Sequence, residues 1–123
     1  MAACAPGPKP NQVMGRLPQH SWHGPIGRAS YSNGGVITVE LGGHTELTTT
    51  TCFKHAKAKI GIMQDDARVQ VEAGGTEVIA TDGRLEIDDC TPGHLKATMW
   101  ASFADGGRVE ASIDSNMTAT SDP

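Results

Sequence analysis

Residues 95–113 read LKATMWASF-ADGG-RVEASI, and the alternation of their side chains decides the fold class. Apolar residues occupy every second position over residues 95–103 and again over residues 109–113. A period of two places one face of a strand against a core and the other face in water. The Asp-Gly-Gly sequence between the two runs supplies the positive φ angles of a tight turn. The stretch therefore predicts a β-hairpin of two half-buried strands.

Similar runs continue on the N-terminal side of this hairpin. Val36–Leu41 and Thr48–Thr51 are rich in β-branched residues, which suit a pleated surface better than a helix. Glycine-containing pairs separate the runs at Asn33-Gly34-Gly35, Gly42-Gly43, Gly74-Gly75 and Asp82-Gly83, and each is typical of a hairpin turn. The predicted strands are residues 36–41, 46–53, 56–63, 67–73, 76–81, 84–88, 95–103 and 107–114.

Seven or eight short strands joined by tight turns predict an all-β protein, with an antiparallel β-sandwich or jelly-roll-like fold. The predicted sandwich domain covers residues 28–114. Residues 115–123 are polar and are predicted to form a C-terminal tail.

Residues 1–27 differ in composition from the rest of the chain. They hold five of the 7 prolines, and proline cannot donate to a β-ladder, so an extended Pro/Gly-rich arm is predicted here. The arm is either a flexible leader or a segment that docks on a neighbouring subunit. In the second case its contact residues are Pro6, Pro8 and Pro10.

The composition excludes several classes of protein. Leu, Ile, Val and Phe make up about 17% of the chain, which is below the roughly 20% found in ordinary globular domains, so the predicted core is thin. The formal net charge is −4, and all 14 acidic residues follow Gly27, which disfavours binding to nucleic acid. No apolar run is long enough to span a bilayer, so no transmembrane segment is predicted.

Cys52 and Cys90 both lie in the predicted β domain, and a disulfide between them would close a loop of about 38 residues. Two reduced thiols in an intracellular protein are the alternative. Cys4 is left unpaired, and Met1-Ala2-Ala3-Cys4 resembles the end of a bacterial lipobox. This resemblance implies a membrane tether through Cys4, although no charged or apolar signal region precedes it.

The sequence contains no recognisable catalytic or metal-binding constellation. The nucleophile elbow, the phosphate-binding loop, the zinc-protease helix and the dinucleotide fingerprint are all missing from it. The five histidines are dispersed, and the only close pair is His20 with His23, which is too few ligands for zinc. We therefore predict no enzyme activity, no catalytic residue, no metal and no cofactor.

The two tryptophans are the candidate interface residues. Trp100 alternates with Met99, so it points to the face opposite the core side chains of its strand. An exposed tryptophan is a typical anchor of a protein interface, whereas a second sheet covering Trp100 would make it a core residue. Trp22, in the predicted arm, is the other candidate.

Residues 64–88 and Ala104–Ala111 share a strand–Gly–strand pattern. Residues 64–88 resemble the repetitive β-structure of phage and secretion-system puncturing spikes. Both stretches resemble the OstA-like jelly roll of lipopolysaccharide transport. The resemblance covers about a quarter of the chain. It implies β architecture and carries over no functional residue.

The leading functional hypothesis is a non-enzymatic structural protein that self-associates into a homo-oligomer or larger assembly, such as a virion, a tail or a surface particle. A thin core, Thr/Gly-rich strand edges and a Pro-rich arm all favour association. The alternative is an extracytoplasmic binding module, a processed bacterial lipoprotein carrying the Cys52–Cys90 disulfide. A small hydrolase or metal enzyme that uses the scattered histidines ranks third. The predicted location is accordingly the virion or an extracytoplasmic space.

Overall fold

The structure of the protein is a computed structural model, which describes residues 11–18, 21–32, 35–52, 54–61, 67–73, 75–91 and 93–119. All regular elements of these residues are β-strands, which confirms the predicted all-β class. The strands are β1 (Gln12–Arg16), β2 (Ser21–Pro25), β3 (Ala29–Tyr31), β4 (Ile37–Gly42), β5 (Thr45–Thr49), β6 (Ala56–Lys59), β7 (Ala67–Ala73), β8 (Thr76–Ile79), β9 (Asp82–Thr91), β10 (His94–Ser102) and β11 (Arg108–Ala119).

Hydrogen bonds join the eleven strands into one continuous sheet, in the order β6-β9-β10-β11-β3-β4-β5-β7-β8, with β1 paired to β11 and β2 to β1. The 12-residue strand β11 organises this sheet, because β10 lies along one of its edges and β1 and β3 share the other. The β3–β11 pairing is parallel, over Ala29–Tyr31 and residues 117–119. The sheet is therefore mixed. The prediction of seven or eight purely antiparallel strands is wrong in both respects.

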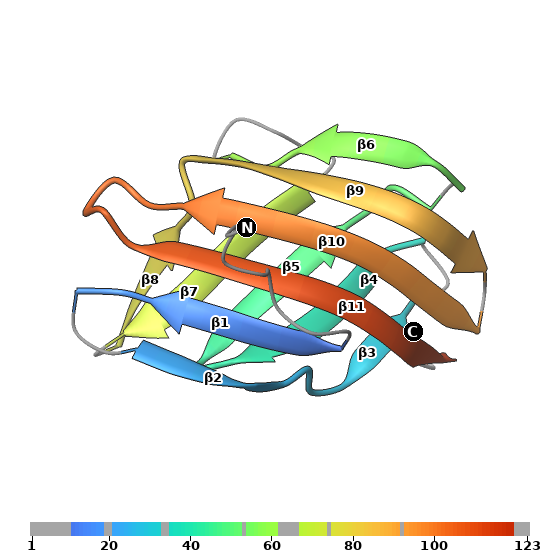
Figure 1. Ribbon diagram of the computed structural model, residues 1–123, viewed down its shortest axis with the longest axis horizontal. Coiled ribbons are helices and arrows are strands. Elements are labelled where there is room, and N and C mark those ends of the chain that lie inside the picture. The colour runs from blue at the N-terminus through green and yellow to red at the C-terminus, as the bar shows by residue number, and fades with distance from the viewer. Residues whose placement is uncertain are drawn as a thin grey trace, which may run out of the picture.

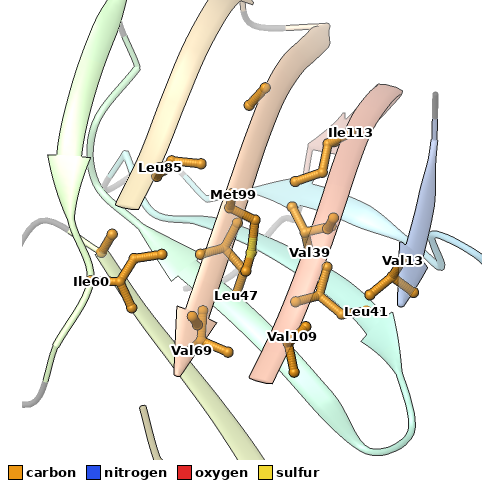
Figure 2. Close-up of a cluster of buried hydrophobic side chains, with 14 of the residues drawn as sticks. Val13, Val39, Leu41, Leu47, Ile60, Val69, Leu85, Met99, Val109 and Ile113 are labelled. Atoms are coloured by element: carbon orange, nitrogen blue, oxygen red, sulfur yellow. The ribbon is translucent and has the colours of Figure 1, made fainter. Parts of the chain in front are cut away.

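The sheet curls so that two groups of strands face each other. In Figure 1, β1, β11, β10 and β9 lie side by side nearest the viewer, while β4, β5 and β7 cross behind them. Alternate residues of both groups point inward and are fully buried, for example Val39, Leu47 and Val69 from the rear strands and Leu85 and Val109 from the front ones. Figure 2 shows these side chains gathered in one cluster between the strands.

The N-terminal segment departs from the predicted arm. Strands β1 and β2 pair antiparallel as a hairpin, in which Val13 is buried and pairs with Ala111 of β11. Pro18 lies after β1, and Pro25 is the last residue of β2, so neither interrupts a ladder. The remaining arm residues named above, Pro6, Pro8 and Pro10, lie outside the described residues, as does Cys4.

Two further boundaries differ from the prediction. Residues 115–119, predicted as a polar tail, extend β11, because Met117 is buried and this part of the strand pairs with both β10 and β3. Asp82-Gly83, predicted as a hairpin turn, lies inside a ladder: β9 starts at Asp82 and pairs with β10 and β6, while β8 pairs with β7. Sequence neighbours here belong to different parts of the sheet.

Candidate functional site

The outward surface of the front strands carries the residues most suited to an interface. Side chains directly opposite each other in antiparallel strands share a face, and the registers align one row across six strands. This row contains His23, Met14, Glu110, Trp100, Arg84 and Lys59. We call its neighbourhood the tryptophan face, defined by Met14, Arg16, His23, Lys57, Lys59, Asp82, Arg84, Glu86, Trp100, Arg108 and Glu110.

Trp100, Arg108 and Glu110 form a connected unit at the centre of this face. The Arg108 Cζ atom lies 4.6 Å from the centroid of the Trp100 ring. The Arg108 Nε–H donates to Glu110 Oε2 at 3.2 Å, with both side chains largely exposed. A guanidinium over an indole ring is held by a cation–π attraction, worth about 0.5–1 kcal/mol at an exposed site. Trp100 therefore lies outward and is only partly buried.

Two shallow hollows adjoin this unit. One, of about 410 Å³, is lined by residues of the β1–β2 hairpin together with Arg108 and Glu110. The other, of about 260 Å³, lies across β9, β10 and β11 and shares Arg108 and Glu110 with the first. Met14, on the rim of the first hollow, is 42% exposed and is the one exposed large hydrophobic side chain in the part of the chain that the structure describes.

Trp22, the other predicted interface residue, has a different position. Its indole Nε1–H donates to the Leu41 carbonyl oxygen at 3.0 Å. The ring lies where side chains at Gly15 and Gly43 would be, since a Cβ at Gly15 would stand 2.3 Å from the Trp22 ring. Trp22 is thus half-buried between β2 and the β4–β5 hairpin. It also borders the first hollow, which adjoins Arg108 and Glu110.

The predicted disulfide is present between Cys52 and Cys90, with a Cα–Cα distance of 5.2 Å. Cys52 follows β5 and Cys90 lies near the end of β9. The bond therefore ties the rear strands to the front strands, at positions separated by 38 residues in sequence.

The four histidines that the structure describes do not converge on a common site. His23 lies on β2, His44 in the β4–β5 turn and His55 before β6, while His94 Nε2 lies within hydrogen-bond distance of Asp114 Oδ1, at 2.7 Å. Among the described residues, no three His, Cys, Asp or Glu side chains are grouped to hold a metal. His20 lies outside them. In the same residues there is no helix long and apolar enough to cross a membrane.

Comparison with known proteins does not identify the family of this chain. No family model, curated protein or solved structure matches the chain. The site must therefore be interpreted from its own chemistry.

The sequence predicted Trp100 as an interface residue, but it did not predict the contacts with Arg108 and Glu110. The signal was available in the turn, where Gly106 has a φ of 93° and the Phe103 N–H donates to Gly107. A three-residue hairpin loop with glycine in the left-handed position sets the register of its strands. That register places Glu110 opposite Trp100 and Arg108 beside them.

Proposed function

We propose that the protein is a non-enzymatic structural protein that assembles with further copies of itself, as a component of a virion, tail or surface particle. The observation that carries the proposal is the grouping of the partly buried Trp100 with the exposed Arg108 and Met14 on one face of the sheet. Tryptophan, arginine and methionine are enriched in interfaces, and tryptophan and arginine dominate their binding energy.

The architecture supports this role. The outward surface belongs to long, mutually paired strands, β10 and β11 above all, so an interface built on it is preorganised. We take the curled arrangement of front and rear strands as a jelly-roll-like sandwich, a scaffold suited to broad, flat contacts.

The disulfide favours a second candidate, an extracytoplasmic binding module. Disulfides persist in oxidising environments, so the Cys52–Cys90 bond supports an extracytoplasmic or virion location for either function. The two candidates differ in what the tryptophan face contacts: a copy of the same chain in the first, and an unrelated molecule in the second.

Light scattering on a sizing column tests the proposal over about a hundredfold range of concentration, a range wide enough to bracket micromolar dissociation constants. We expect the mass of the untagged protein to rise above 12.9 kDa with concentration. Trp100→Ala should weaken association by about tenfold or more, as for a central interface residue. Lys96→Ala, an exposed change on the same strand outside the tryptophan face, serves as the matched control. A wild-type protein that stays at 12.9 kDa throughout would overturn the proposal and leave the binding module.

A further inference from the structure

The rear strands also have an outward surface, and it is acidic. We define the acidic face by the outward carboxylates of β4, β5, β7 and β8: Glu40, Glu46, Glu72 and Glu77. These lie next to the outward Arg28 and Arg68 at its margin. A hollow of about 380 Å³ opens on this face and is lined by three of the four carboxylates and by His44.

The carboxylates of this face are paired with each other across the strands. Glu40 stands directly opposite Glu46, and Glu72 stands directly opposite Glu77. Like charges at directly opposite positions destabilise a sheet. Within the described residues, none of the four carboxylates has a cationic side chain within 4.0 Å. The acidic face thus carries repulsion that an external cationic surface would relieve.

The tryptophan face holds five cationic and three acidic side chains, and Lys57 stands opposite Glu86, but this face too contains like-charge cross-strand pairs, here cationic. Arg16 stands directly opposite Arg108, and Lys59 stands directly opposite Arg84. In the described part of the chain, Arg16, Lys59 and Arg84 have no carboxylate within 4.0 Å. Each face therefore holds two like-charge cross-strand pairs, cationic on one and anionic on the other.

The two faces cannot meet within one molecule. The inward side chains of the front and rear strands share one core, so the outward side chains point to opposite sides (Figures 1 and 2). Only a second copy can bring the cationic pairs of the tryptophan face against the anionic pairs of the acidic face. Charge complementarity of this kind selects partners and sets their orientation.

We infer that copies of the chain associate head to tail, with the tryptophan face of one copy docked on the acidic face of the next. The inference rests on the proposed function and names the partner surface for it. A contact between two different surfaces leaves one face of each kind free on every pair. Association then continues into an open chain or closes into a ring.

Two charge-reversal variants of the full chain test this arrangement. The first, Arg16→Glu with Arg84→Glu, reverses the tryptophan face and replaces no residue of the Trp100–Arg108–Glu110 unit. The second, Glu46→Lys with Glu72→Lys, reverses the acidic face. Each variant alone should lose at least about tenfold in association constant, since like charges then oppose across the contact. Lys96→Glu, outside both faces, changes the net charge in the same direction as the first variant, by half as much, and shows how far net charge alone affects association. Circular dichroism and thermal unfolding confirm that each variant is folded.

Mixing the two variants provides the decisive measurement. Each variant retains one unaltered face, and these two faces are complementary. The two reversed faces are also opposite in charge, so the mixture should regain the association that neither variant shows alone. If the acidic-face variant associates as well as the wild type, the tryptophan faces pair with each other and the head-to-tail inference is overturned, while self-association stands. The inference is also overturned if both variants associate normally, or if the mixture stays at the mass of the single chain. A wild-type protein that never associates would instead remove the proposed function itself.

Discussion

The guanidinium of Arg108 lies over the ring of Trp100 and at the same time donates to Glu110, so one arginine holds two outward side chains of neighbouring strands. Trp100 and Glu110 are directly opposite in the β10–β11 register. Held together in this way, the three side chains lose little further rotamer entropy when a partner covers them.

We expect Arg108→Gln to weaken self-association by about fivefold or more, while the free energy of unfolding changes by less than about 1 kcal/mol, the size of an exposed cation–π contact. Urea denaturation and sedimentation equilibrium measure the two quantities. A loss of stability well above that size would show that Arg108 serves the fold and not the interface.

Association should depend on ionic strength because the two faces carry opposite charge. We expect the association constant to fall by about tenfold or more between about 50 mM and about 500 mM salt, where the Debye length shrinks to a few ångströms. Light scattering at matched protein concentrations gives the constants. Association that strengthens with salt would indicate an apolar contact instead.

Gly15→Ala should destabilise the protein by about 1–3 kcal/mol, because the new Cβ would stand 2.3 Å from the Trp22 ring and the ring would have to move. Gly24→Ala in the same hairpin is the matched control, since nothing lies within 4 Å of its Cβ position. Chemical denaturation compares the two. Equal stabilities would mean that Trp22 does not pack against Gly15.

Val13→Ala should cost about 2 kcal/mol of unfolding free energy, because Val13 is 1% exposed and the change removes two buried methyl groups. Gln12→Ala, one residue earlier and exposed, should change it by less than about 0.5 kcal/mol. If the two variants are equally stable, the β1–β2 hairpin does not contribute to the core.

The disulfide should stabilise the fold by about 4 kcal/mol, the chain-entropy value for a closed loop of 38 residues. Denaturation with and without reductant measures this difference. Before reduction, one of the 3 cysteines should titrate as a free thiol in denaturant, and all 3 afterwards. Three free thiols in protein purified without reductant would contradict the bond.

Local sequence patterns predicted those strands in which apolar and polar residues alternate without interruption. The hairpin of β10 and β11 was predicted because every inward position over residues 95–103 and 109–113 is apolar and the turn between them contains glycine. The N-terminal strands were missed for a physical reason. Gly15 occupies an inward position of β1, and its space is filled by Trp22 from the next strand, so the alternation is interrupted in sequence although the core is continuous.

The sequence by itself determined the all-β class, the central hairpin and the outward direction of Trp100, because each follows from interactions between residues close along the chain. Only the tertiary structure decided that β1 and β3 share one edge of β11 and that the tryptophan face and the acidic face point to opposite sides of the molecule. Registers such as Arg16 with Arg108 and Lys59 with Arg84 join residues far apart in the sequence. These registers are set when the whole sheet curls around its core, and no local periodicity encodes them.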